Sequence, residues 1–431
     1  MTPVMTGIVG LITLFSFIGF GMPIGFAMGL VGFFGFAYLI SFHAAIIKTG
    51  VVTFELSTNY AIGTVPLFLF MAHILFASGI GKDLYDSAAC WLGRRRGGLA
   101  MATIGASSGF AAASASSIAT TATMGLVALP EMRKHNYDLS LASGSVAAGG
   151  TIGSLIPPSG MFIIYGILTE TSIGAMFAAG IIPGILLAIF YMVTINIICR
   201  INPAAGPRGP KYTFMEKLAS LKKTGEVIVL FVLVMGGIIW GWFTPTEAGA
   251  VGAFGAILIS LARKRLNWRA FKEAIYSTLK TTGMIFGILF GALVFNSFVT
   301  VTNIPLNIVN FVTESGFSPM MVLLLILGVY LLLGMVLDAS AMMTLTVPLF
   351  FPLVTSIGFD AVLFGVLVVR MTEIALITPP VGMNVYVLSG IAKDIPLNKI
   401  FKGTAPFVAA DGLHVALLLM FPALVLWLPS L

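Results

Sequence analysis

The chain has 431 residues, of which 58% are hydrophobic and only 9% are charged, and its mean hydropathy is +1.05. These values lie far outside the range of soluble domains and indicate a protein that crosses a membrane many times. Apolar segments of about 20 residues, long enough to span a bilayer, recur from Val4 to Trp427 with short polar interruptions. The gaps between them leave no room for a separate soluble domain.

The net charge of +7 comes from basic residues gathered in a few segments. Of the 23 lysines and arginines, 21 lie at 81–97, 133–134, 200–223, 263–280 and 393–402. Because cytoplasmic loops of membrane proteins carry an excess of Lys and Arg, these segments mark one membrane face and do not indicate nucleic-acid binding. The two cysteines, Cys90 and Cys199, lie near these segments, where a structural disulfide is not expected.

The charge map predicts the path of the chain. The N-terminal residues have no basic region and no small-residue cleavage site before their apolar run, so we expect them to form a membrane helix of the mature chain. About ten spans follow, with both termini outside the cytoplasm. The predicted spans are 5–20, 22–41, 60–80, 139–168, 173–199, 225–243, 247–262, 281–300, 361–390 and 405–428.

Two further segments predict re-entrant helical hairpins, which enter and leave the membrane on the same side. Residues 98–131 lie between two basic segments, and 103–123 contain nine Ser or Thr in 21 residues. Such a stretch is too polar to face lipid but is acceptable when it is buried against protein. Residues 319–356 predict a second hairpin that opens from the opposite side. We call these the first hairpin and the second hairpin.

The chain also contains an internal repeat. Sliding it against itself by 222 residues aligns 130–161 with 352–383 and gives nine identities, among them Asp138 with Asp360 and a shared Pro-Pro-x-Gly-Met. According to the distribution of basic segments, the first copy crosses the membrane away from the cytoplasm and the second copy crosses toward it. The fold class predicted is therefore all-α and polytopic with an inverted-topology repeat, which in secondary transporters places substrate and ion sites near the bilayer midplane.

The two Pro-Pro pairs predict helix breaks at the centre of each repeat. Proline removes a backbone donor and its ring clashes with the preceding turn, so the helices should open at Pro157–Pro158 and Pro379–Pro380. The freed carbonyls need protein, water or a cation, and the N-terminus of the following half-helix favours an anion. Structural kinks are the alternative, but breaks in both inverted halves favour a binding site.

Polar residues at the hairpin tips can meet these breaks. They are Ser114, Ser116 and Ser117 in the first hairpin and Gly334, Asp338, Ser340 and Thr344 in the second. Hydroxyl and carbonyl oxygens at neutral sites suit sodium, whereas close packing of small residues between helices is the alternative explanation.

Charged residues within the predicted spans are costly in lipid and need a partner or a cavity. Arg370 and Glu373 are spaced to share a helix face and can pair with each other, or Arg370 can also contact an anionic substrate. Glu247 is expected to cap a helix with Thr244 or Thr246. His73 and the Asp411/His414 pair lie apart from other possible ligands and are expected to be structural.

Several motifs in order along the chain carry a family resemblance. GMPIGFAMGL, FAAASASSIAT, GTIGSLIPPSGM, FTPTEAGAV and ITPPVGMNVYV resemble the large membrane subunit of tripartite ATP-independent periplasmic (TRAP) transporters, the DctM family. The resemblance covers essentially the whole chain. Two departures are Ala115, where glycine is common in the family, and Arg370 with Glu373, where many members are neutral.

The resemblance implies a fixed scaffold and a mobile, elevator-type transport domain in the bacterial inner membrane, with both termini in the periplasm. It implies uptake driven by sodium as coupling ion, with no other cofactor. Its partners would be a small four-helix membrane subunit (DctQ-like) and a periplasmic substrate-binding protein (DctP-like). The division predicted is 1–96, scaffold; 97–168, first hairpin and broken helix; 169–318, scaffold and loops; 319–390, second hairpin and broken helix; 391–431, C-terminal span.

The resemblance also implies site residues. Carried over by motif, the sodium ligands are Ser114, Ser116, Gly153, Ile156 and Pro157 in a first site and Gly334, Ala375, Thr378 and Val381 in a second. Most would act through main-chain carbonyls, with the Thr378 hydroxyl contributing. Candidate substrate-binding residues are Ser117, Ser159, Asp338, Thr344, Arg370 and Asn384.

Other classes of function are less well supported. The only Gly-Lys, at Gly81, is followed by Asp83 and not by the Ser or Thr of a P-loop, and no HExxH metal motif occurs. An ATP-driven pump and an enzyme are therefore disfavoured, whereas a channel and a stand-alone sodium/carboxylate symporter remain alternatives. The half-helix N-termini and Arg370 lead us to expect a small organic acid as solute.

Overall fold

The structure is a computed structural model that describes residues 1–114, 116–314 and 316–430. Over these residues the chain forms helices and no strand, as the predicted all-α class requires. Ala115, one of the two departures from the family pattern, lies outside the described residues.

The first half of the described chain ends with a long helix that leads to the basic segment at 200–223. Its helices are α1 (Pro3–Gly19), α2 (Ile24–Leu39), α3 (Phe42–Thr58), η1 (Tyr60–Gly63), α4 (Thr64–Ala77), α5 (Ile80–Leu92), α6 (Gly98–Ser114), α7 (Ser117–Lys134), α8 (Leu139–Thr151), η2 (Ile152–Ser154), α9 (Gly160–Thr169) and α10 (Ile173–Ile201). The pair α6 and α7 is the first hairpin, where the sequence predicts it.

The second half repeats this order. Its helices are α11 (Phe214–Ile239), α12 (Pro245–Ala262), α13 (Trp268–Val301), α14 (Ile304–Glu314), α15 (Pro319–Gly334), α16 (Ala339–Ser356), α17 (Ala361–Ala375), α18 (Met383–Ile391), α19 (Leu397–Met420), α20 (Ala423–Leu426) and η3 (Leu428–Ser430). The pair α15 and α16 is the second hairpin.

The repeat reaches well beyond the short motif that reveals it. The arms of the first hairpin begin at Gly98 and Ser117, and those of the second begin 221 and 222 residues later, at Pro319 and Ala339. The same order pairs α1 with α11, α2 with α12, α5 with α14 and α10 with α19, while the single helix α13 takes the place of α3, η1 and α4. The order of helices therefore recurs along nearly the whole described chain.

The shared aspartate of the repeat has a local role in each copy. Asp138 Oδ1 accepts the N–H groups of Ser140 and Leu141 at 2.8 and 3.1 Å, and Asp360 Oδ1 accepts those of Val362 and Leu363 at the same distances. A side chain that satisfies the free N–H groups of the first turn fixes where a helix begins. These caps set the starts of α8 and α17, the helices that lead to the two breaks.

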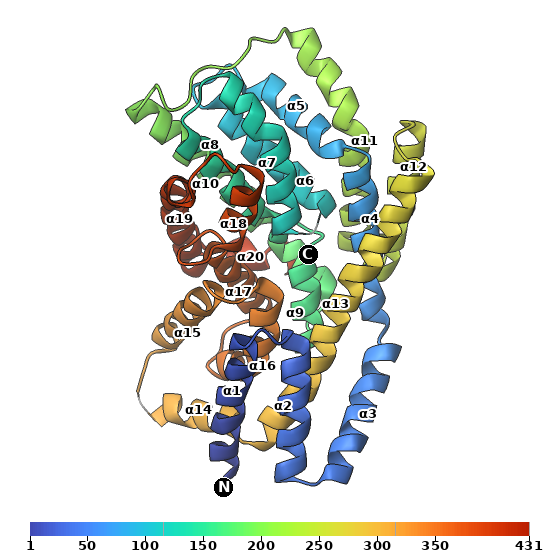
Figure 1. Cartoon of the computed structure of the whole chain (residues 1–431), viewed down its shortest axis with the longest axis vertical. Helices are drawn as coiled ribbons and strands as arrows, with labels where there is room; N and C mark the ends of the chain where they lie inside the picture. The colour runs from blue at the N-terminus through green and yellow to red at the C-terminus, as the bar shows by residue number, and fades with distance from the viewer. Residues whose placement is uncertain (115, 315, 431) are drawn as a thin grey trace.

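Three helices lie where the sequence predicts no element. α3 carries Lys48 and Glu55, which interrupt the apolar run that a predicted span needs. α5 and α14 are amphipathic helices of 13 and 11 residues, too short to cross a bilayer. Figure 1 shows α5 near the upper end of the molecule and α14 near the lower end, as expected for equivalent elements of an inverted repeat.

Three predicted spans also have different bounds. The predicted span 225–243 lies in α11, which starts earlier, at Phe214, and ends at Ile239. The predicted span 281–300 is the second part of the 34-residue α13, which starts at Trp268. The predicted span 405–428 starts earlier, at Leu397, and ends at Met420, after which α20 and η3 fold back against α10 and α17.

Six helices of the described chain are long and apolar enough to cross a membrane, which supports a polytopic membrane protein. They are Tyr60–Ala77, Ile173–Ile201, Pro245–Ala262, Trp268–Val301, Ala339–Ser356 and Leu397–Met420. Pro3–Gly19, Ile24–Leu39, Gly160–Thr169 and Pro319–Gly334 are apolar but shorter. The predicted number of ten spans stays a prediction.

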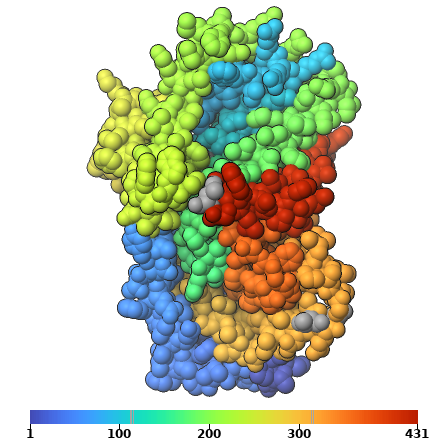
Figure 2. Space-filling view, turned by 180° about the vertical axis from the view of Figure 1, so that it is seen from behind, coloured from blue at the N-terminus to red at the C-terminus, as the bar shows by residue number. Residues whose placement is uncertain are grey.

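The helices pack in two groups. In the peripheral group (α1–α4 and α11–α13), α13 packs against α2 and α4, and α12 packs against α4. In the hairpin group (α6–α10 and α15–α19), α8 packs against α7 and α19, and α17 packs against α15. Figure 2 shows the blue and yellow-green surface of the peripheral group on one side and the orange and red surface of the second hairpin and the C-terminal helices on the other.

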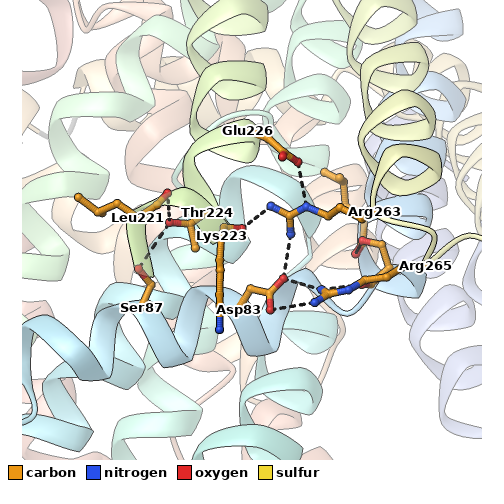
Figure 3. A network of polar contacts seen from close by, with 10 residues as sticks. Asp83, Ser87, Leu221, Lys223, Thr224, Glu226, Arg263 and Arg265 are labelled. Atoms are coloured by element: carbon orange, nitrogen blue, oxygen red, sulfur yellow. Dashed lines mark hydrogen bonds and ion pairs between the residues drawn. The ribbon is translucent and has the colours of Figure 1, made fainter. Parts of the chain in front are cut away.

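The amphipathic helix α5 lies between the groups, since it packs against both α6 and α11. Its buried Asp83 accepts hydrogen bonds from Arg263 at 2.8 Å and from Arg265 at 2.5 Å, and both arginines come from the connection between α12 and α13. Arg263 also donates to Glu226 of α11 at 2.8 Å. Figure 3 shows this network, which fastens α5 to the peripheral group.

Candidate ion and substrate site

Both predicted breaks are present. The first break, residues 152–159, separates α8 from α9 and contains η2, whereas the second break, residues 376–382, separates α17 from α18. The Pro157–Pro158 and Pro379–Pro380 peptide bonds are both cis. The first break is buried throughout, but Pro379 and Pro380 are exposed, so the two equivalent segments differ in their surroundings.

The tip of the first hairpin lies against the first break. Ser114 Oγ is 2.7 Å from Thr120 Oγ1, and Ser116 caps the start of α7. A Cβ atom added at Gly153 would lie 3.1 Å from the Ser116 carbonyl oxygen and 3.0 Å from Thr120 Oγ1. The structure therefore brings Ser114, Ser116 and Gly153 together, as the first sodium set requires.

Ile156 and Pro157, the other two residues of that set, lie at the far end of the same break. The Ile156 side chain faces α10, because a Cβ atom at Gly184 would lie 2.6 Å from it. Both residues are buried. Only their main-chain oxygens can serve as ligands, because their side chains are apolar.

The tip of the second hairpin lies against α17. A Cβ atom at Gly334 would lie 2.6 Å from the Cβ of Ala375, so these two residues of the second sodium set are in direct contact. The Thr378 hydroxyl donates to the Ile374 carbonyl at 2.6 Å and keeps its lone pairs for a cation. Val381 lies half-buried in the second break.

Four of the substrate candidates have hydrogen-bond partners within the protein, three of them on neighbouring residues. Asp338 accepts the N–H groups of Ser340 and Ala341 and caps α16. Thr344 donates to a carbonyl of its own helix at 2.9 Å. Ser159 caps α9 and donates to the Ser154 carbonyl at 2.5 Å. Buried Asn384 lies 3.5 Å from the Ala147 carbonyl of α8, so it connects the second break to the first half of the chain.

Arg370 pairs differently from the prediction. Its guanidinium donates to Asp411 of α19 and, at 3.2 Å, to Tyr191 of α10, and all three side chains are fully buried. The ion pairs of the described residues do not join Arg370 to Glu373, although the two share a helix. The expectation that Asp411 is isolated is therefore wrong, because it is the counter-charge of Arg370.

Glu373 contacts the other half of the molecule instead. Its Oε2 accepts a hydrogen bond from Ser117 Oγ at 2.5 Å, and Ser117 Oγ lies 2.9 Å from Ser154 Oγ of η2. Helix α17 of the second repeat thus touches both the hairpin tip and the break of the first repeat. Ser117, a substrate candidate, has its hydroxyl proton engaged in this contact.

The remaining polar predictions are structural contacts. Glu247 and Thr244 form the expected capping box at the start of α12. His73 Nδ1 lies 3.0 Å from Thr278 Oγ1, and His414 Nε2 lies 3.0 Å from the Pro183 carbonyl.

The sequence did not indicate Tyr191 or Ser154, and it indicated Asp411 only as a structural residue beside His414. Tyr191 and Asp411 stand in apolar helices 220 residues apart, and the only local signal was that Asp411 is ionisable within a predicted span.

Comparison with known proteins decides the family. The family model described as "Tripartite ATP-independent periplasmic transporter, DctM component" matches residues 11–424. The chain belongs to the DctM family. It is 36% identical over 378 residues to the C4-dicarboxylate TRAP transporter large permease protein DctM of Pseudomonas aeruginosa, covering 88% of both chains. It is 33% identical over 423 residues to the sialic acid TRAP transporter large permease protein SiaM of Vibrio cholerae, covering 95% of both.

This DctM-family chain also shares its fold with a solved structure. The YdaH transporter of Alcanivorax borkumensis superposes with a TM-score of 0.61 at 13% identity, over 86% of this chain and 87% of that one. Membership identifies the chain as the large permease subunit of a TRAP transporter, not an enzyme, and confirms the family resemblance drawn from the motifs.

Proposed function

We propose that this permease subunit imports a small organic acid by coupling its movement to sodium ions bound at the two breaks. The observation that carries the proposal is the meeting of each hairpin tip with a break or the helix that leads to it: Ser116 with Gly153, and Gly334 with Ala375. At the first break the Thr120 hydroxyl and the Ser116 carbonyl lie beside Gly153, with the Ser114 hydroxyl 2.7 Å from that of Thr120. The Thr378 hydroxyl lies at the second break. Such oxygens are the ligands that a hard cation prefers.

The first sodium ion would bind among Ser114, Ser116, Gly153, Ile156 and Pro157, and the second among Gly334, Ala375, Thr378 and Val381. The half-helices α9 and α18 start immediately after the breaks and direct their N–H groups toward them. An anionic substrate would bind between the two ions, near Ser159, Asp338, Thr344 and Asn384. Ser117 and Arg370 would act next to this site, since their polar groups already contact Glu373 and Asp411.

The two packing groups suggest how the solute crosses. The hairpin group would move as a transport domain against the peripheral group as scaffold, in an elevator-type mechanism. In this proposal α10 and α19 belong to the transport domain, because α10 packs against α6, α8 and α17 and α19 packs against α8 and α17. The division predicted from the sequence instead placed 169–318 and 391–431 outside it.

The family description names a tripartite system, which supports two partners. A small four-helix membrane subunit would pack beside the scaffold, and a periplasmic substrate-binding protein would deliver the solute. The chain would lie in the bacterial inner membrane with both termini in the periplasm. The named relatives transport C4-dicarboxylates and sialic acid, both organic acids, which favours the same class here.

Reconstituted uptake tests the proposal. The permease, reconstituted with the small subunit and the binding protein of its system, would be supplied with a radiolabelled C4-dicarboxylate and with sialic acid in turn. We expect uptake only with an inward sodium gradient and only with the binding protein present. Uptake that continues unchanged in potassium would contradict sodium coupling, and uptake without the binding protein would instead favour a stand-alone symporter.

A further inference from the structure

Glu373 of α17 is a buried carboxylate that contacts the first repeat and forms no ion pair among the described residues. Its side chain is 1% exposed. Oε2 accepts the hydrogen bond from Ser117, while Oε1 has no hydrogen-bond partner among the described residues. A buried ionised group without a partner is costly in a membrane protein and usually marks function.

The hydrogen bonds around Glu373 have a fixed direction. A serine hydroxyl has one proton and two lone pairs. When Glu373 is ionised, Ser117 donates its one proton to it, and Ser154 is then the donor in its contact with Ser117. Both hydroxyl oxygens therefore keep lone pairs that a cation can use, next to the free Oε1 of Glu373.

The charges near Glu373 do not cancel. Arg370, one helical turn before it, is paired with Asp411, so one positive and one negative charge balance each other. Tyr191 and His414, which lie beside this pair, contribute hydrogen bonds to Asp411 and to the Pro183 carbonyl. An ionised Glu373 leaves the buried cluster with one negative charge, which a single monovalent cation would balance.

We propose that Glu373 Oε1, Ser117 Oγ and Ser154 Oγ bind a monovalent cation at the contact between the two repeats, separate from the two sodium sets described above. A divalent ion fits less well, because no group of three or more His, Cys, Asp or Glu occurs among the described residues. The cation would join α17 to the tip of the first hairpin and to the first break, so its binding would stabilise the contact between the halves. This inference rests on the proposed sodium coupling.

Equilibrium binding of ²²Na⁺ to the purified full-length chain tests the site without any solute. We expect E373Q to bind one sodium ion fewer per chain than the unchanged protein and to keep the others. The double variant S117A/S154A should weaken the binding of the same ion. The matched control E273Q makes the same chemical change at an exposed carboxylate that pairs with Arg269, and it should bind as many ions as the unchanged protein.

Thermal stability separates a cation site from a structural role. In choline without sodium, E373Q should unfold at the same or a higher temperature than the unchanged protein, because it removes an uncompensated buried charge. Its gain in stability on adding sodium should be smaller. A lower midpoint in choline together with an unchanged sodium count would overturn the inference and leave the two sodium sets intact. If the unchanged chain bound no ²²Na⁺ at all, the proposed sodium coupling itself would fail.

Discussion

At the scale of single residues, the buried ion pair of Arg370 and Asp411 links α17 to α19, and Tyr191 adds a contact from α10. Two charges inside a protein stabilise it only when they remain together, because removing one leaves the other buried and unpaired. The pair therefore holds three helices of the hairpin group in one arrangement.

Replacing Asp411 with Asn should be strongly destabilising. We expect the free energy of unfolding to fall by about 3–5 kcal/mol, the typical cost of breaking a buried ion pair, as measured by denaturant unfolding in mixed micelles. The matched control is Asp394→Asn, which removes the carboxylate from an exposed pair with Arg133.

The Arg133 hydrogen bond lowers the pKa of Asp394. The pair therefore stabilises the folded protein fully at pH values above the ordinary pKa of aspartate, and this stabilisation is lost as the pH falls through the lowered pKa. At neutral pH the control variant should change stability only slightly, because exposed ion pairs contribute little. Equal losses in the two variants would contradict the assignment of Asp411 as the counter-charge of Arg370.

The sequence showed that Arg370 and Glu373 are energetically unfavourable within an apolar span unless they have partners, but it did not identify those partners. Arg370 and Glu373 were conspicuous because ionisable groups are rare within apolar spans. Their spacing suggested a mutual pair, whereas their contacts are with Asp411, 41 residues away, and with Ser117, 256 residues away. Helical spacing identifies only neighbours on the same helix, so contacts between helices had no local signal.

At the scale of elements, the second hairpin meets α17 through glycine. Gly334 lies at the last turn of α15, and its Cα approaches Ala375 too closely for a side chain. This close approach places the hairpin tip against the residues of the second sodium set.

We expect Gly334→Ala to push the tip away from α17, since its new Cβ would lie 2.6 Å from the Ala375 Cβ. The apparent sodium affinity should fall by about tenfold or more, which corresponds to about 1.4 kcal/mol of binding free energy, in a titration of sodium-dependent thermal stability. Gly328→Ala on the same helix is the matched control, because nothing lies within 4 Å of its added Cβ. An unchanged sodium affinity in Gly334→Ala would show that the contact between Gly334 and Ala375 is not needed for ion binding.

Asp83 offers a test of how α5 is held. Asp83→Asn removes the counter-charge of Arg263 and Arg265, and hydrogen bonds to charged groups contribute about 1.5–3 kcal/mol each at most. We expect faster amide hydrogen exchange along α5. Asp86→Asn, at an exposed position of the same helix, should leave exchange unchanged, and equal exchange in both variants would show that the arginines do not fasten α5.

Elements with a strong local signal were predictable and the others were not. The hairpins follow from a polar stretch between basic segments, and the breaks follow from the Pro-Pro pairs, which no continuous helix accommodates. Helices α5 and α14 are amphipathic and short, and α3 contains Lys48 and Glu55. Helices of this kind contain no long apolar run and therefore do not stand out as membrane spans. Shifting the sequence against itself by 222 residues would, however, have aligned α5 with α14.

At the scale of the whole molecule, an apolar cavity of about 270 Å³ lies at the boundary between the two packing groups. Met71 of α4 and Phe231 of α11 line it from the peripheral group, and Ser108 of α6, Ile156 of the first break and Ile185 of α10 line it from the hairpin group. The side chains at this boundary do not fill the space between the groups. The proposed movement of the hairpin group against the peripheral group would take place along this boundary.

Linking the groups should stop transport. After Cys90 and Cys199 are replaced with serine, the pair Met71→Cys and Ser108→Cys would be bridged by mercuric ion across the cavity. We expect uptake to fall to background and to return when a thiol reductant removes the bridge.

The control pair Thr64→Cys and Thr246→Cys lies within the peripheral group, where the two native hydroxyl oxygens are 2.8 Å apart. Bridging it should leave uptake intact. Full uptake in protein bridged between α4 and α6 would exclude an elevator-type movement across this boundary.

We propose that sodium binds where the hairpin tips meet the two breaks. Amide hydrogen exchange of the full-length chain in lipid nanodiscs, with sodium compared against choline at equal ionic strength, tests it at the level of individual segments. We predict that sodium slows exchange at both hairpin tips and at residues 152–159 and 376–382, while α2 and α12 do not change. Identical exchange of the tips and breaks in the two salts would contradict the claim.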